Sequence, residues 1–565
     1  MKLRLTSCIV FSTIGVALLG IYYFSRLWPI LPLSIATGAV ALIIVSYKLG
    51  ASSAWLVGAC VLLFAHTSIA LLYPETLSGF DPDGYAVWVN QALNSGDVTQ
   101  AETRTYSKLP MFLLLISAVS LIGELFPRNA LIVIPISISI IVPLFVAWFT
   151  SSLTDCTKTE WPAVPAALLT TVGTMTILRG YLPIAMTMGY LLLLLAIIMS
   201  TRFYMEERKE DITIFIILCL GISLTHRFTI LLLALVAIIQ AIYYVVSGSS
   251  NRISRDLLIL PAIGFAFLIL QWIFIVTTLN TTVYQLLNIF SETGTQIGVD
   301  SVRTGSSRPV IESRLLGIVA RRAHAIVLIP LAGLAWLYVA MDRPNGSRSS
   351  VGLSLALAMG VCVFIPLSVF FPEEINYTRT ISIAEPVLFG LAIGAGWILW
   401  NRAEQYPISI QQVARYTLLL LLILVIASQI GSAPIAADHP AGFRGYLESD
   451  EASAKMWGQE YTVSNVSTDP YFAHERPYPD YHVNSDGEII EQYNYKYKPI
   501  LEPFTDQSVI NVCPDSVMFR EIHIYRSPRA QVLNWEPEPI LNTHYTRLYD
   551  AGKVQYFNDP RCNPE

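Results

Sequence analysis

Residues 79–85 read Gly-Phe-Asp-Pro-Asp-Gly-Tyr and follow a long apolar segment, residues 51–73. The carboxylates of Asp81 and Asp83 therefore lie just beyond this segment. Aspartate caps helices well, and proline is tolerated at the first helical position because its missing N–H has no acceptor there. We predict a helix from Asp83 to Asn94, with Asp81 as its N-cap and Ser95-Gly96 as its stop. This helix should lie in the plane of a membrane interface.

The composition is typical of a membrane protein. Of the 565 residues, 54% are hydrophobic and only 14% are charged, and the mean hydropathy is +0.54. The apolar residues form blocks of about 20, the length at which a helix spans a bilayer, so the fold class is an all-α polytopic membrane protein with about 13 transmembrane helices. No basic cluster or zinc-type spacing indicates nucleic acid as a partner. The blocks occupy residues 5–24, 28–47, 51–73, 109–126, 129–150, 162–178, 181–200, 212–224, 226–247, 256–279, 322–341, 350–371, 380–400 and 414–432.

Basic residues predict the side of the membrane on which each loop lies, because cytoplasmic loops are enriched in Lys and Arg. Lys2 and Arg4 place the N-terminus in the cytoplasm, and the loops 74–108 and 280–320 then lie outside. The C-terminal region also ends outside, which requires an odd number of crossings, whereas we count about 14 apolar blocks. One block between residues 109 and 247 must therefore be re-entrant or cross only halfway, and the sequence does not say which.

The chain divides into a multi-span region, residues 1–432, and an extracytoplasmic C-terminal domain, residues 433–565. In the second region aromatic and acidic residues replace the apolar runs, and alternating segments such as residues 516–525 predict a small α/β domain. Cys513 and Cys562 fall in this domain and could form a disulfide if it is extracytoplasmic. No Cys-x-x-Cys motif occurs, so cysteine-based metal or redox chemistry has no support.

Several charged residues are placed on the predicted outer side, at the ends of apolar blocks. Each of the basic ones could be an interfacial side chain that snorkels to headgroups, and the acids could simply belong to a turn or a helix cap. Together they would offer cations for a phosphate and carboxylates for a proton or a metal. The candidates are Arg179 in a tight turn, His226 and Arg227 at a hairpin tip, Arg379 at the start of a span, and Glu102 and Lys108 in the loop that holds the acidic pair.

A sugar joined through phosphate to a lipid is a substrate whose transfer requires both such cations and such carboxylates. The lipid tail stays in the bilayer, and Arg or His can stabilise the charge that develops on the leaving phosphate. A carboxylate can take the proton of the acceptor hydroxyl, and a second carboxylate can bind a divalent cation, Mg²⁺ or Mn²⁺, or orient the acceptor. Such a donor needs no nucleotide-binding domain, and neither a Walker loop nor a G-x-G-x-x-G motif behind a strand is present.

Four short motifs resemble those of the polytopic glycosyltransferases of the GT-C class, which use polyprenyl-phosphate sugars. The resemblance implies that Asp81 is the catalytic base, that Asp83 binds a metal or the acceptor, and that Arg379 holds the lipid phosphate. It also implies a hexose donor such as dolichyl-phosphate mannose and a cell-surface glycan or glycoprotein as acceptor. The motifs are Phe-Asp-Pro-Asp-Gly-Tyr at 80–85, Lys-Leu-Pro-Met at 108–111, Arg-Gly-Tyr-Leu-Pro at 179–183 and Leu-Thr-His at 224–226.

The sequence also departs from this class. The Trp-Trp-Asp-Tyr-Gly signature of the large oligosaccharyltransferases is missing, so en bloc transfer of a glycan to asparagine is not expected. Two apolar blocks, rather than one, precede the block that leads to the acidic loop. Two other functions stay open: a transporter or flippase of lipid-linked sugars, and a scaffold or receptor whose outer domain binds a partner.

Overall fold

The computed structural model describes 16 separate stretches of the chain and divides it into two compact units. The first unit contains residues 1–69, 88–282 and 320–434, and the second contains residues 70–87, 283–319 and 435–565. The described residues are 35–43, 53–72, 80–100, 106–154, 162–206, 208–246, 258–275, 315–342, 350–365, 377–432, 449–461, 466–468, 495–497, 516–520, 546–550 and 554–558.

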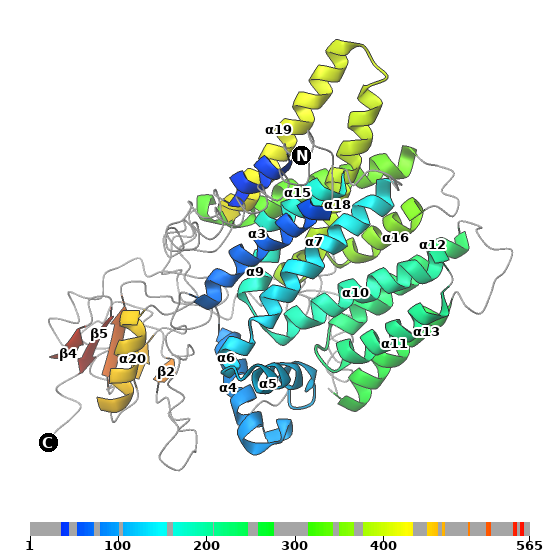
Figure 1. Ribbon diagram of the computed structural model, residues 1–565. Helices are drawn as coiled ribbons and strands as arrows, with labels where there is room; N and C mark the ends of the chain where they lie inside the picture. The colour runs from blue at the N-terminus through cyan, green and yellow to red at the C-terminus, as the bar shows by residue number, and fades with distance from the viewer. Residues whose placement is uncertain are drawn as a thin grey trace, which may run out of the picture. The chain divides into compact units, whose positions relative to one another are not determined.

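The first unit is a bundle of helices that coincide with the predicted apolar blocks (Figure 1). Its central members are α7, α10, α12, α16 and α18, which pack on one another. Large buried side chains such as Phe145, Phe149 and Phe389 fill the space between them. The first predicted block, residues 5–24, lies outside the described residues. The helices are α3 (Ser53–Leu72), α5 (Met111–Gly123), α6 (Pro127–Ala130), α7 (Val133–Thr154), α8 (Ala163–Leu169), η2 (Thr170–Val172), α9 (Thr174–Tyr181), α10 (Ala185–Glu206), α11 (Lys209–Ser223), α12 (Thr229–Val246), α13 (Ile259–Leu270), η4 (Gln271–Ile275), α15 (Leu315–Asp342), α16 (Ser350–Cys362), α18 (Tyr377–Ala403) and α19 (Ile408–Ser432).

Within the described stretches, six helices are long and apolar enough to cross a membrane. A seventh span results if the bent pair Ala163–Val172 and Thr174–Tyr181 is counted as one. Helix α19 has few buried positions and exposes Leu419, Leu420 and Ile423, as expected of a helix that faces lipid. The polytopic membrane class therefore holds, whereas the number of about 13 spans stays a prediction.

The bent pair lies in the part of the chain where the sequence requires an irregular crossing. Its two helices meet at an angle of 57° around Gly173, which makes it a broken span or a re-entrant loop. Helix α5 is a second irregular element, because 13 residues extend only about 20 Å, less than the hydrocarbon core. Both lie between residues 109 and 247, the range in which the sequence requires an irregular crossing.

The helix that carries the acidic pair, α4 (Phe80–Ser95), begins earlier than predicted. Asp81 is therefore part of the first helical turn and not an N-cap that precedes it. Pro82 fits there because the first-turn N–H groups have no intrahelical acceptor. The predicted end is correct, since Gly96 follows the helix with φ of +70°, the left-handed conformation that favours glycine.

In the second unit, the described C-terminal residues form a small α/β arrangement, as predicted. Helix α20 (Ser449–Tyr461) packs on β5, and the five strands have the order β2-β1-β3-β5-β4. Strand β1 pairs in parallel with β2 and β3, and β5 pairs antiparallel with β3 and β4. The strands are β1 (Val466–Thr468), β2 (Tyr495–Tyr497), β3 (Ser516–Arg520), β4 (Thr546–Asp550) and β5 (Val554–Asn558). Cys513 and Cys562 lie outside the described residues, so their disulfide stays a prediction.

Candidate functional site

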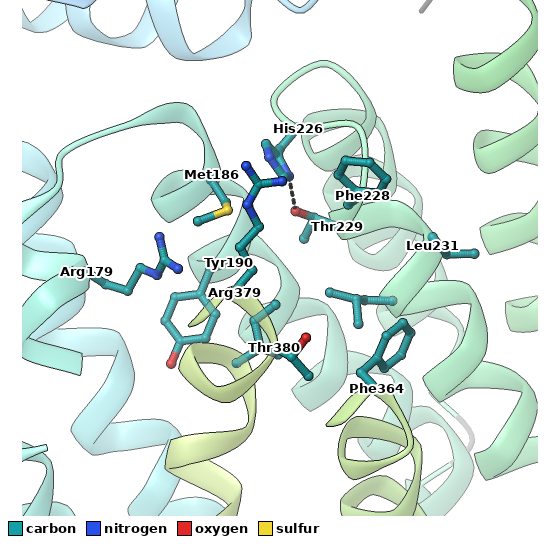
Figure 2. A pocket seen from close by; sticks show the side chains of 12 residues that line it. Arg179, Met186, Tyr190, His226, Phe228, Thr229, Leu231, Phe364, Arg379 and Thr380 are labelled. Atoms are coloured by element: carbon teal, nitrogen blue, oxygen red, sulfur yellow. Dashed lines mark hydrogen bonds between the residues drawn. The ribbon is translucent and has the colours of Figure 1, made fainter. Parts of the chain in front are cut away.

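A pocket lies in the first unit, at one end of the helix bundle (Figure 2). It is lined by residues at the start of α10, α12 and α18 and at the end of α9. Phe364, just after the end of α16, completes the lining. Three residues predicted from the sequence as candidates line it: Arg179 from α9, His226 from the turn before α12, and Arg379 from the first turn of α18. The fold thus brings together side chains that are up to 200 residues apart in the chain.

The sequence predicts Arg179 in a tight turn between two apolar blocks. In the structure it instead belongs to a helix, the last turn of α9. Its side chain is buried, so it is not an interfacial residue that snorkels to headgroups. Its Nη2 donates a hydrogen bond of 3.0 Å to Oγ of Ser382, and the charge of Arg379 acts on it. Within the described part of the chain no carboxylate forms an ion pair with Arg179. Because burying a cation without a counter-charge is costly, the pocket favours an anion.

His226 is buried in the turn between α11 and α12. Burial, together with the charges of Arg379, Arg227 and Arg179, lowers the pKa of its imidazole from 6.5 to about 3. The ring is therefore neutral near pH 7, and its Nδ1 lies 3.0 Å from Oγ1 of Thr229. Gly189 on α10 permits this packing, because a Cβ there would lie 2.9 Å from the same hydroxyl oxygen.

The rest of the pocket wall is mostly apolar. Figure 2 shows Phe228, Leu231 and Phe364 on the side away from Arg179. The cavity therefore combines a cationic end with a hydrophobic end. A ligand that carries one anionic group joined to an apolar chain matches both ends.

The hairpin tip beside the pocket is fixed by hydrogen bonds to its backbone. Nε2 of Gln271 donates to the carbonyl oxygen of Ser223 at 2.6 Å, and Nε1 of Trp272 donates to that of Arg227 at 3.2 Å. The guanidinium of Arg227 lies 4.8 Å from the ring centroid of Phe228 and is not part of the pocket lining. Lys108 is exposed and precedes α5, whose Met111 N–H donates to the carbonyl oxygen of Leu224 in this hairpin.

The acidic candidates belong to other parts of the chain. Asp83 is buried in the portion of α4 that belongs to the second unit, and the side chain of Asp81 lies outside the described set. Glu102 lies in the undescribed residues 101–105. The roles of these three carboxylates therefore stay predictions.

The expected divalent cation has no ligand set in the described stretches. A Mg²⁺ or Mn²⁺ site needs several oxygen ligands, yet no group of three or more His, Cys, Asp or Glu side chains comes together among the described residues. The binding of this cation by Asp83 therefore stays a prediction.

Sequence reasoning missed Glu385, which is buried in α18 two turns after Arg379. It also missed Ser382, the acceptor for Arg179. The signal for Glu385 was present, because a single carboxylate inside an apolar block is a functional candidate by default. For Ser382 no signal was present, since small hydroxyl residues are common in membrane helices.

Comparisons with known proteins find likeness at the level of structure only. The chain matches no protein-family model and no curated protein. Among solved structures, it is similar to the Archaeoglobus fulgidus oligosaccharyltransferase in complex with Zn and sulfate, at 13% identity and a TM-score of 0.47. It is also similar to the archaeal oligosaccharyltransferase AglB from Archaeoglobus fulgidus in complex with an inhibitory peptide and a dolichol-phosphate, at 13% identity and a TM-score of 0.46.

The first of these matches covers 74% of this chain and 60% of the other, and the second covers 74% and 63%. The chain thus spans about three fifths of the length of the structures that it matches. Likeness at this identity does not assign an activity.

Proposed function

We propose that the protein is a membrane glycosyltransferase that moves a sugar, a hexose such as mannose, from a polyprenyl- or dolichyl-phosphate donor to a cell-surface glycan or glycoprotein. The observation that carries this proposal is the pocket in which Arg179, Arg379 and His226 meet an apolar wall. The donor has the same two parts, since a phosphodiester anion is joined to an apolar tail. An arginine pair suits the phosphate because guanidinium groups form charge-assisted hydrogen bonds with its oxygens.

In the proposed reaction the acceptor hydroxyl attacks the anomeric carbon of the sugar. Its proton passes to the carboxylate of Asp81, and the bond between that carbon and the phosphate oxygen breaks. The lipid phosphate leaves with the bonding electrons, and Arg379 and Arg179 stabilise the charge that develops on it. His226, being neutral, can donate a hydrogen bond to the phosphate without adding a third charge to the pocket.

Basic residues at the far ends of the same helices support the outer placement of the pocket. Arg202 lies near the end of α10 and Arg402 near the end of α18, whereas the pocket lies where both helices begin. Because cytoplasmic loops are enriched in basic residues, Arg202 and Arg402 support an outward-facing pocket end. Donor and acceptor would then meet on the extracytoplasmic face.

The test is single-turnover transfer from radiolabelled polyprenyl-phosphate mannose to cell-surface glycan by the purified protein. We expect transfer by the wild type and a loss of about 10²–10⁴-fold for Asp81→Asn, the usual size of a general-base effect. Asp97→Asn is the matched control, because Asp97 lies in the same loop and its Oδ1 accepts the N–H of Thr99 at 2.8 Å. Equal transfer by wild type and Asp81→Asn would remove Asp81 from the proposal.

One observation favours a transporter or flippase of lipid-linked sugars as the second candidate. The bent pair α8–α9 is a broken helix, and transporters bind anions at the N-termini of such half-helices. In this protein, however, the N-terminus of α9 is occupied by Glu385 and Gln429, and the cationic pocket lies at the other end of α9. Movement of labelled lipid across reconstituted vesicles without sugar transfer would favour the transporter.

A further inference from the structure

Helix α9 receives its N-terminal cap from another helix. Its N-cap residue is Gly173, which has no side chain to bond the first backbone N–H groups. The carboxylate of Glu385 on α18 replaces that cap. Its Oε1 accepts the N–H of Met175 at 3.0 Å, and its Oε2 accepts the N–H and the hydroxyl of Thr176 at 2.7 and 2.8 Å.

Gly173 makes room for this carboxylate. A Cβ at this position would lie 2.8 Å from Oε2 of Glu385 and 2.9 Å from the ring of Phe389. The backbone angles of Gly173, φ −62° and ψ 116°, are open to any residue. Glycine is therefore required by the approach of Glu385 and not by backbone conformation.

A second helix completes the cap. Oε1 of Gln429 on α19 accepts the N–H of Thr174 at 2.9 Å, and the hydroxyl of Thr174 donates to the backbone oxygen of Gln429 at 2.9 Å. The first three N–H groups of α9 thus have partners on α18 and α19. The carboxyl group of Glu385 also lies at the positive end of the helix dipole, where the ionised form is stabilised.

The same face of α18 extends to the other end of α9. Arg379, Ser382 and Glu385 follow one another at intervals of three residues, so they share one side of the helix. Glu385 contacts the start of α9, and Ser382 accepts the hydrogen bond of Arg179 near its end. Since eight residues span only about 12 Å, α9 is a short rod held by α18 at both ends.

Contacts with α3 oppose any sliding at the C-terminal end of this rod. Gly180 lies so close to α3 that a Cβ would collide with the side chain of Thr67, and the hydroxyl of Tyr181 donates to the carbonyl oxygen of His66 at 2.9 Å. The break at Gly173 separates α9 from α8, so α8 does not continue into it as one helix. The position of α9 along its axis is therefore set jointly by the cap at its N-terminus and by these contacts with α3.

We propose that Glu385 is a positioning residue for the phosphate site: its carboxylate anchors α9 so that Arg179 is held in the pocket. This inference rests on the proposed function, because it assigns to Arg179 the task of binding a phosphate. Glu385 does not line the pocket and acts through the helix that it caps.

The experiment measures the binding of citronellyl phosphate, a short isoprenoid phosphate, to the purified full-length protein. Glu385→Gln should weaken binding about tenfold in the wild-type background, the effect expected when one charge-assisted contact is misplaced. In an Arg179→Ala background the same substitution should weaken binding by less than about twofold, because two mutations that act through one contact are not additive. Asp211→Asn is the matched control, since Asp211 is also a buried acid but pairs with Arg202.

A second variant covers the case in which Glu385→Gln does not fold. Thr176→Val removes only the hydroxyl that donates to Glu385 and should weaken binding about threefold, whereas Thr176→Ser should bind like the wild type. Equal losses for Glu385→Gln with and without Arg179 would overturn the positioning role. So would wild-type binding by folded Glu385→Gln.

The result for the wild type separates the two proposals. If wild type does not bind citronellyl phosphate, the proposed function fails and this inference fails with it. If wild type binds and Arg179→Ala weakens binding while folded Glu385→Gln does not, only this inference fails.

Discussion

The two ends of helices α10 and α12 differ in how their buried polar side chains are paired. At the end away from the pocket, Gln240 accepts a hydrogen bond from Ser200 and donates one to Thr201, both at 2.8 Å. Nearby, Asp211 is paired with Arg202 at 3.6 Å. At the pocket end, Arg179 bonds a hydroxyl and lies within the field of Arg379. The first arrangement pairs its buried acid with a cation, whereas in the second no described carboxylate forms an ion pair with the buried Arg179.

This difference indicates which buried polar groups are structural and which await a ligand. A charge pair or a closed amide network stabilises the contact between helices and needs nothing more. A buried cation beside another cation has a high free energy until an anion arrives. The comparison therefore supports our proposal that a ligand binds at the pocket end.

The largest expected effect comes from removing a cation at each end in turn. Arg179→Ala and Arg379→Ala should each lower the affinity for citronellyl phosphate about 10–100-fold, the range for hydrogen bonds to charged groups. Arg202→Ala should leave that affinity unchanged, because Arg202 lies at the opposite end of α10. Isothermal titration of the three variants in one detergent measures the contrast. A comparable loss of affinity in Arg202→Ala would show that net charge, and not the pocket, holds the ligand.

The next effect concerns the stability of the pocket end at low pH. His226 has a pKa near 3 in the folded protein and an ordinary value near 6.5 when unfolded. Below pH 6.5 only the unfolded state takes up a proton there, so the contribution of His226 to stability falls as the pH falls towards 3. Relative to His226→Gln, the wild type should lose on the order of 2 kcal/mol between pH 7.5 and pH 5. Thermal unfolding at both pH values measures this, and parallel curves for the two proteins would contradict it.

A smaller effect should follow from filling the space beside His226. Gly189→Ala places a Cβ 2.9 Å from Oγ1 of Thr229 and 3.1 Å from Cβ of His226. Such overpacking should cost about 1–3 kcal/mol and weaken phosphate binding several-fold. Gly333→Ala on α15 is the control, because a Cβ there meets nothing within 4 Å. Equal stability of the two variants would mean that the residues around Gly189 rearrange to accept the Cβ without loss of stability.

The smallest effect is expected for the closed network at the other end. Gln240→Leu should cost roughly 1 kcal/mol, since Ser200 and Thr201 keep their hydrogen bonds to the carbonyl oxygen of Ile197. Its affinity for citronellyl phosphate should equal that of the wild type. Unfolding and binding measured on the same sample test both parts, and weakened binding would show that the two ends are coupled.

The sequence predicted the helices well because blocks of about 20 apolar residues leave few alternatives in a membrane. It also singled out Arg179, His226 and Arg379, which line one pocket, because charged residues at the ends of such blocks are conspicuous. It placed Arg179 in a turn because Gly180 and Pro183 read as helix breakers, whereas the close approach of Thr67 requires Gly180 within the helix. The capping of α9 by Glu385 could not be predicted, because it joins residues 209 and 210 positions apart.

The most direct test of the central claim is a cryo-electron microscopy structure of the protein with a polyprenyl phosphate bound. We predict density for the phosphate between the guanidinium groups of Arg179 and Arg379, beside His226, with the tail leaving along Phe228 and Leu231. A phosphate bound elsewhere, with the side chains of Arg179 and Arg379 empty of ligand, would contradict the account.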